Sequence, residues 1–145
     1  MNAEHLFIDT NILVYAHDKS AGLKHTKAQS LILSCFDRPC PPAISTQVLQ
    51  ELFVNLVKKR VPLKSTRKII DMYSEFEVIG HDLGLVKEGM DIHERYKLSL
   101  WDSLILAAAQ RARATMLWSE DLQAGQDIDG VTVCNPFLEE ATRKK

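Results

Sequence analysis

The chain has 145 residues, of which 46% are hydrophobic, and a formal net charge of −1 at pH 7. This length and composition predict one globular domain over residues 1–145, with a core of about residues 1–137 and a frayed tail at 138–145. The near-neutral charge excludes a general attraction to nucleic acid, so any such binding requires local clusters of Lys and Arg.

Because we find no basic and apolar leader and no apolar run of about 18 residues, we expect a soluble, cytoplasmic protein without a membrane segment. The three cysteines lack metal-binding spacing, which predicts reduced, packed thiols.

Short apolar segments alternate with segments of helical periodicity along the chain. The predicted elements, in order, are a strand at 5–8, helices at 10–18 and 22–37, a strand at 43–46, helices at 47–60 and 63–76, a strand at 76–80, helices at 82–97 and 99–114, and strands at 115–118 and 131–134. In the helix at 22–37, we predict that Leu31, Ile32 and Phe36 point inward. Strands separated by helices indicate a parallel sheet covered on both faces, which is a three-layer α/β domain.

Asp9 stands where the first predicted strand ends and the next helix begins. In one interpretation it caps the helix, because a short oxygen-bearing side chain accepts hydrogen bonds from the amides of the first turn. In the other it is a functional carboxylate, because open α/β sheets bind ligands beyond the carboxyl ends of their strands. The second interpretation gains support only if other acidic residues converge on the same edge.

Glu51 and Asp102 have similar positions along the chain. Glu51 lies one turn into the helix after the second strand, beside the apolar stripe, where it either lines a groove or faces water. Asp102 shares its helical face with Ile105 and Leu106, and a carboxylate in apolar surroundings is costly unless its oxygens are satisfied. Its alternative role is a capping box with Ser99 as the N-cap.

Glu120 and Asp121 follow the strand at 115–118, although acidic residues are also ordinary in loops. Carboxylates gathered at one edge repel one another, and a fold tolerates them when a hard divalent cation holds them. Mg²⁺ and Mn²⁺ prefer such oxygen ligands. The chemistry expected of this cluster is metal-assisted phosphodiester hydrolysis, in which the ion activates water and stabilises charge on the phosphate.

Four stretches carry a resemblance to a known family, and they are, in order, FIDTNILVYA, STQVLQELF, LSLWDSLILAAA and LWSEDLQAGQDIDGVTVCNPF. They resemble the successive motifs of the PIN-domain ribonucleases, most closely the VapC-type toxins of bacterial toxin–antitoxin pairs. The resemblance runs from the first strand to Phe137. It implies a Rossmann-like PIN domain with a central parallel sheet flanked by helices, and an acidic pocket that holds Mg²⁺ or Mn²⁺. It also implies endonucleolytic cleavage of RNA, a homodimer, and inhibition by a small antitoxin protein.

The resemblance also assigns roles to individual residues. The positions that match its catalytic, metal-holding acids are Asp9, Glu51, Asp102 and Asp121. The secondary positions around them are Thr10, Asn11, Ser119 and Glu120. The spacing after Asp102 is about one residue longer than in many relatives, so Glu120 remains an alternative to Asp121 as the fourth acid.

A basic cluster is the predicted contact with the RNA backbone, although such runs are also ordinary solvated faces. It consists of Lys58, Lys59, Arg60, Lys64 and Arg67. Two other functions remain open at this point. The chain is then either a housekeeping RNA- or DNA-cleaving nuclease of the PIN fold without an antitoxin, or a PIN binding module without catalytic activity.

Overall fold

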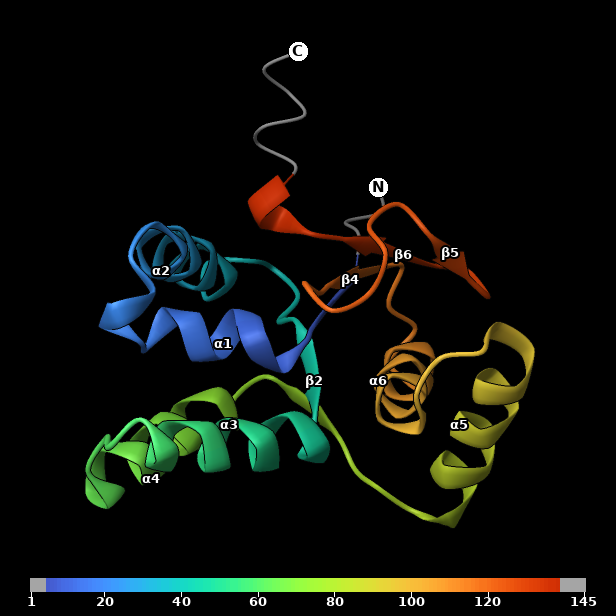
Figure 1. The fold of residues 1–145 in the computed structure, drawn as a ribbon, viewed down its shortest axis with the longest axis horizontal. Helices are drawn as coiled ribbons and strands as arrows, with labels where there is room; N and C mark the ends of the chain where they lie inside the picture. Colours follow the sequence, from blue (N-terminus) through green and yellow to red (C-terminus); the bar gives the residue numbers. More distant parts are fainter. Residues whose placement is uncertain (1–4, 139–145) are drawn as a thin grey trace.

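The computed structural model describes residues 5–138 and has a six-stranded sheet flanked by helices (Figure 1). The strand order is β3-β2-β1-β4-β6-β5. The strands are β1 (Leu6–Ile8), β2 (Ala43–Ser45), β3 (Glu77–Ile79), β4 (Met116–Trp118), β5 (Asp127–Ile128) and β6 (Val131–Cys134). All neighbouring pairs are parallel except β5 and β6. This arrangement confirms the predicted α/β class with a central parallel sheet, to which β5 adds one antiparallel edge strand. The predicted tail at 138–145 lies outside the described residues, apart from Leu138.

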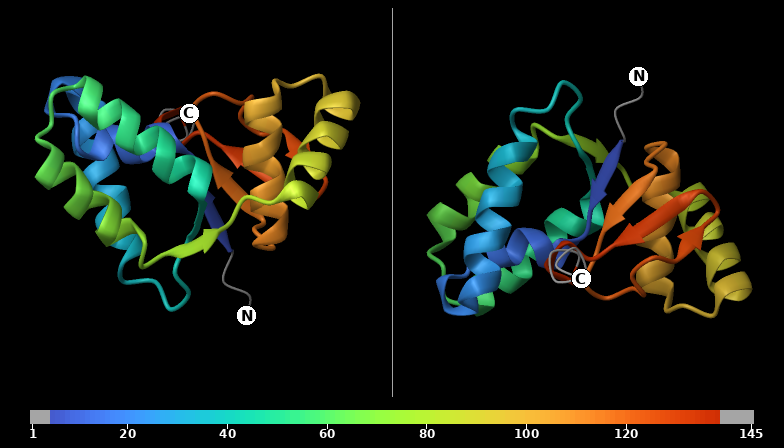
Figure 2. Two further views of the ribbon diagram at one scale, coloured as in Figure 1. Left: turned by 90° about the horizontal axis from the view of Figure 1, so that it is seen from below. Right: turned by 90° about the horizontal axis from the view of Figure 1, so that it is seen from above.

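The helices lie on both sides of the sheet (Figure 2). They are α1 (Thr10–Ala16), the 3-10 turn η1 (Lys19–Ala21), α2 (Leu23–Cys35), α3 (Thr46–Lys58), α4 (Leu63–Tyr73), α5 (Leu83–Tyr96) and α6 (Leu100–Arg111). From β1 to β3 the chain moves in one direction along the sheet, and from β3 to β4 it crosses back. Because parallel crossovers are right-handed, α1 to α4 gather on one side and α5 and α6 on the other. None of the helices in the described part of the chain is long and apolar enough to span a bilayer.

The core consists of the apolar strands and the faces of the helices that cover them. Every residue of β1 and β2 is buried, as expected for strands covered on both faces. In α6 the stretch from Ser103 to Ala109 is buried throughout. The small Gly89 lets α5 approach this helix, because a Cβ at that position would meet Leu104 Cδ2 at 2.6 Å.

Three sequence predictions are wrong, each for a local reason. Phe36 is 43% exposed rather than inward, because it is the C-cap of α2, at the edge of the core, where its ring meets the buried Phe76 at 5.0 Å between centroids. Cys40 is exposed rather than packed, because it lies in the proline-rich connection before β2. The loop at 119–130 contains the short strand β5, which pairs with β6 through a tight turn at Asp129 and Gly130. Both turn residues have positive φ, and Asp-Gly between apolar residues was a recognisable hairpin signal.

Candidate active site

Parallel pairing brings the ends of β1 and β4 together at one edge of the sheet. Ile8 pairs with Trp118, so the residues that follow them, Asp9 and Ser119, are neighbours in space. The Asp9 amide continues the pairing by donating a hydrogen bond to the Trp118 carbonyl at 2.9 Å. Helices α1, α3 and α6 begin around this edge, with the loop after β4 beside them (Figure 1). The topology therefore supplies four separate segments to one site.

Asp9 both caps α1 and stands in the site, so its two interpretations are compatible. One carboxylate oxygen accepts a hydrogen bond from the Thr10 amide at 2.7 Å, and the other accepts one from the Ser119 hydroxyl at 2.9 Å. The residue is only 4% exposed. Burial raises the pKa of Asp9 to about 7, although these two hydrogen bonds oppose the rise. The negative charges of Asp121 and Glu51 raise it further.

Glu51 is held by neutral donors from two helices. The Thr10 hydroxyl donates to Oε1 at 2.6 Å, and the Gln47 side-chain amide donates to Oε2 at 3.2 Å. The same Gln47 amide group donates to the Trp101 carbonyl at 3.2 Å, which links the start of α6 to Glu51. Sequence reasoning missed Gln47; its position one helical turn before Glu51 was the available signal. Glu51 therefore faces the site rather than bulk water.

Asp102 and Asp121 interact electrostatically with each other. The Ser99 hydroxyl accepts a hydrogen bond from the Asp102 amide at 3.1 Å, so Ser99 is the N-cap of α6, as predicted. The Asn11 side-chain amide donates to both carboxylate oxygens of Asp121, at 3.0 and 3.1 Å. Partial desolvation raises the pKa of Asp121, and the charge of Asp102 adds to the rise. The two carboxylates are therefore close enough to repel each other.

Glu120, the alternative fourth acid, is turned away from the other acids. Its Oε1 accepts a hydrogen bond from the Tyr15 hydroxyl at 2.5 Å, and its Oε2 forms an ion pair with Lys24. Burial would raise the pKa of Glu120, but the contacts with Lys24 and Tyr15 outweigh it and lower the pKa. This arrangement favours Asp121 as the fourth acid. Neither Tyr15 nor Lys24 was singled out from the sequence.

The donor chemistry of the site fits a hard divalent cation. Asp9, Glu51 and Asp121 offer oxygen atoms, and the hydrogen-bond donors described above for them are neutral, so their charges are oriented without being cancelled. Within residues 5–138, no three His, Cys, Asp or Glu side chains converge closely enough to hold one ion as direct ligands. Mg²⁺ is commonly bound through one or two carboxylates while it keeps several waters. The arrangement therefore fits an ion held partly through water.

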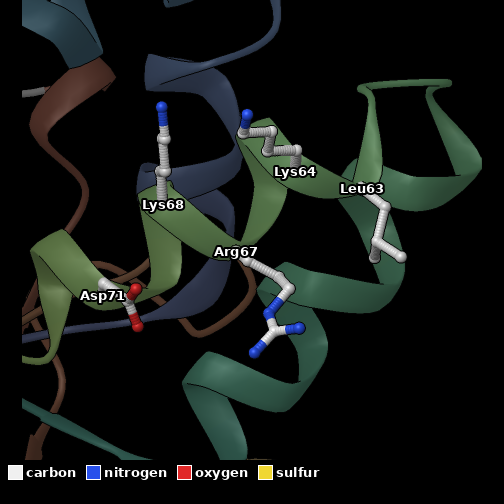
Figure 3. Close-up of a pocket in the computed structure, with 5 residues that line it drawn as sticks. All are labelled: Leu63, Lys64, Arg67, Lys68 and Asp71. Atoms are coloured by element: carbon white, nitrogen blue, oxygen red, sulfur yellow. The ribbon is translucent and has the colours of Figure 1, made fainter.

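The predicted RNA-contacting residues lie away from the acids, at the end of α3 and on α4. Lys59 forms an ion pair with Asp18 at 3.0 Å, so part of its charge is already matched. Five residues of α4 line a surface pocket (Figure 3), and they are Leu63, Lys64, Arg67, Lys68 and Asp71. Figure 3 shows Lys64 and Lys68 pointing to one side of the helix and Arg67 and Asp71 to the other. Lys64 and Arg67 are thus both among the lining residues of the pocket, on opposite sides of the helix.

Comparisons with known proteins agree with this fold. The PIN domain family matches residues 6–126. The chain is 29% identical to a protein in a toxin–antitoxin complex from Klebsiella pneumoniae, over 91% of this chain and 97% of that one, with a TM-score of 0.66. It resembles in fold VapC20 of Mycobacterium tuberculosis, a Sarcin-Ricin loop cleaving toxin, at 17% identity over 80% and 89% of the two chains, with a TM-score of 0.64.

A further fold neighbour is a chain in the crystal structure of VapBC2 from Rickettsia felis, which is bound to a DNA fragment from the VapBC2 promoter. The identity is 21% over 88% of this chain and 96% of the other, with a TM-score of 0.63. No curated protein matches the chain. These two neighbours, at 17% and 21% identity, agree with this chain in fold. Because the family match spans most of the chain, this protein belongs to the PIN domain family.

Proposed function

We propose that this protein is a metal-dependent endoribonuclease that hydrolyses RNA phosphodiester bonds and is the toxin of a toxin–antitoxin pair. The observation that carries the proposal is the buried Asp9 carboxylate, whose pKa is raised to about 7 and which interacts electrostatically with Glu51 and Asp121. Strongly perturbed carboxylates at the ligand-binding edge of a sheet are typical of active sites. Membership of the PIN family and the similarity to the Klebsiella pneumoniae complex support the same activity.

The four acids would hold Mg²⁺ or Mn²⁺, directly or through water, and they are Asp9, Glu51, Asp102 and Asp121. When bound, such an ion activates water and offsets the charge that develops on the phosphate. The chain's own contribution is to orient the acids before the substrate arrives. Thr10 fixes Glu51, Ser119 fixes Asp9 and Asn11 fixes Asp121. Since these donors are neutral, the negative charge stays available for a cation.

The basic residues Lys58, Lys59, Arg60, Lys64 and Arg67 are proposed to contact the RNA backbone. The α4 pocket supports this part of the proposal, because three basic residues, Lys64, Arg67 and Lys68, line it against one acidic residue, Asp71 (Figure 3). Such contacts release counterions, so RNA affinity should fall steeply as salt rises. Lys64→Gln should make the slope of log affinity against log salt shallower by about 0.7 to 0.9. An unchanged slope would remove this residue from the RNA path.

A small antitoxin and a homodimer complete the proposal. The Klebsiella pneumoniae structure is described as a toxin–antitoxin complex, which supports an antitoxin as a partner here. Exposed apolar side chains on α3 and α4 support protein contacts of this kind. They are Phe53, Val54, Val57, Leu63 and Met72. A cytoplasmic location follows from the proposed RNA substrate.

A cleavage assay tests the enzymatic part of the proposal. The purified chain is incubated with structured RNAs in Mg²⁺, in Mn²⁺ and in chelator, and internal cuts are mapped. We expect cleavage only with the ion, and loss of most of it in Asp9→Asn. Asp91→Asn, an exposed acid on α5, is the matched control and should retain full activity. Metal-independent cleavage, or full activity in Asp9→Asn, would overturn the assignment.

A growth experiment separates a toxin from a housekeeping nuclease of the same fold. Expression of the native chain alone should arrest growth, and expression of Asp9→Asn should not. A small protein encoded beside this chain should restore growth and inhibit cleavage when added to the purified enzyme. Normal growth on expression of a chain that is active in the cleavage assay would favour the housekeeping role.

A further inference from the structure

The loop that carries Asp121 has little regular structure to hold it. No helix or strand covers residues 119–126, and Asp121 itself is exposed. The neighbouring charges of Asp102, Glu120 and Glu51 all act unfavourably on the Asp121 carboxylate. On the side of the acids, the Asn11 amide donates to the Asp121 carboxylate. The backbone amide of Asp121 donates to the Ser119 hydroxyl at 3.2 Å. Beyond Asp121 the loop is held by Leu122, which is 6% exposed, and by the Gly125 amide, which donates to the Val133 carbonyl at 2.8 Å. Repulsion therefore favours displacement of Asp121 itself unless the residue before it is anchored as well.

Glu120 is anchored on the far side of this loop by side chains of α1 and α2, which a third segment supports. The Tyr15 hydroxyl of α1 donates to its Oε1 at 2.5 Å, and the Lys24 ammonium of α2 pairs with its Oε2. The Lys24 ammonium also lies 5.1 Å from the centre of the Tyr15 ring and 5.8 Å from that of Phe137, which follows β6. The Tyr15 and Phe137 rings meet edge to face at 5.5 Å. We call Tyr15, Lys24, Glu120 and Phe137 the Glu120 clamp.

The clamp differs from an ordinary surface ion pair. An isolated exposed pair between flexible side chains contributes little. Here the carboxylate is also hydrogen-bonded to a phenol, and the ammonium also packs on two aromatic rings, so fewer side-chain conformations remain open. The Glu120 side chain is 21% exposed and that of Lys24 is 45% exposed. The clamp therefore has a defined geometry on the partly buried side of the loop.

Three successive residues of the loop point in alternating directions. Ser119 donates inward to Asp9, Glu120 reaches outward to α1 and α2, and Asp121 returns toward Asn11. Ser119 is also fixed by its backbone, because its amide donates to the Cys134 carbonyl at 3.1 Å. With Ser119 and Glu120 both held, the peptide that leads into Asp121 has little freedom left.

We propose that Tyr15, Lys24 and Glu120 are positioning residues that fix the loop after β4, so that the carboxylate of Asp121 faces the other acids. They act through Asp121 and touch neither substrate nor ion. The inference rests on the proposed nuclease function for its effect on catalysis. Its structural part concerns this chain alone and is tested without RNA.

The first measurement is amide hydrogen exchange in the metal-free protein. Lys24→Met and Tyr15→Phe should both speed exchange at residues 120–123 while leaving α5 and α6 unchanged, because this part of the loop loses its outer anchor. Lys24→Arg should restore slow exchange, since it keeps the positive charge. The matched control is Lys87→Met, an exposed lysine on α5. Unchanged loop exchange in both Lys24→Met and Tyr15→Phe would overturn the proposal. Tyr15→Phe keeps the aromatic ring, so it remains informative if Lys24→Met fails to fold.

The second measurement is the affinity for Mn²⁺ by electron paramagnetic resonance, followed by cleavage kinetics. A misplaced Asp121 should weaken Mn²⁺ binding by roughly 10-fold and lower kcat, while the KM for RNA stays nearly constant. In a double variant, Lys24→Met with Glu120→Gln, the effects should not add, because the residues act as one unit. A change in KM alone, or additive effects, would contradict a positioning role. If the native chain cleaves no RNA, the proposed function fails while hydrogen exchange still decides on the clamp.

Discussion

Asp9→Asn is expected to stabilise the metal-free protein at alkaline pH, although it removes a residue of the candidate active site. Burial raises the pKa of Asp9 to about 7 in the folded protein, whereas an unfolded chain gives about 3.9. Between these two values the folded state binds a proton that the unfolded state has released, so the free energy of unfolding falls as the pH rises. The loss begins near pH 4, is complete above pH 7 and stays constant beyond it.

The two pKa values correspond to about 4 kcal/mol of destabilisation above pH 7. Asn retains an oxygen for the Thr10 amide but offers one acceptor fewer toward the Ser119 hydroxyl, which costs about 1 kcal/mol. We therefore expect Asp9→Asn to be more stable than the native chain by about 1 to 3 kcal/mol at pH 8. At pH 4, where Asp9 is protonated in the folded state, the variant should be less stable by about 1 kcal/mol.

Urea denaturation in chelator at pH 4 and pH 8 measures both differences. Asp91→Asn serves as the control, because its carboxylate is exposed and its replacement should have little effect at either pH. Mn²⁺ at 100 times its dissociation constant should stabilise the native chain by about 2.7 kcal/mol, and Asp9→Asn by less. If Asp9→Asn were less stable than the native chain by the same amount at both pH values, desolvation of Asp9 would not explain the pH dependence.

Three further variants probe individual contacts. Asn11→Ala removes the amide that donates to both carboxylate oxygens of Asp121 and should lower the rate of RNA cleavage by roughly 10-fold or more. Its circular dichroism spectrum should be unchanged. Full activity would show that Asp121 is oriented by other means. Gly89→Ala places a methyl group against Leu104 and should lower the free energy of unfolding, measured by urea denaturation, by about 1 to 3 kcal/mol. A more stable variant would mean that α5 and α6 separate easily. Ser99→Ala removes the N-cap hydroxyl of α6 and should cost about 1 kcal/mol in the same assay; no change would mean that water replaces the cap.

Much of the architecture was predictable from local patterns. The alternation of short apolar runs with helical periodicity indicated the parallel sheet, because strands covered on both faces leave no polar side. Helix boundaries were also readable: Asp9 and Ser99 carry capping side chains, and both cap helices in the structure. The hairpin at Asp129 and Gly130 had a recognisable turn signal, but β5 was missed because two residues are too few to show periodicity. Phe36 failed for a related reason, since helical periodicity no longer applies once the helix has ended.

The sequence by itself determined that acidic residues stand after strands or in the first turns of helices, because strand ends and helix starts are encoded locally. It did not determine which polar side chains meet there. Glu120 and Asp121 are adjacent and chemically similar, yet one pairs with Lys24, 96 residues away, and the other with Asn11, 110 residues away. Only the closed sheet brings these partners together, because periodicity specifies the face of a helix that is buried and carries no information about the distant side chain that it contacts.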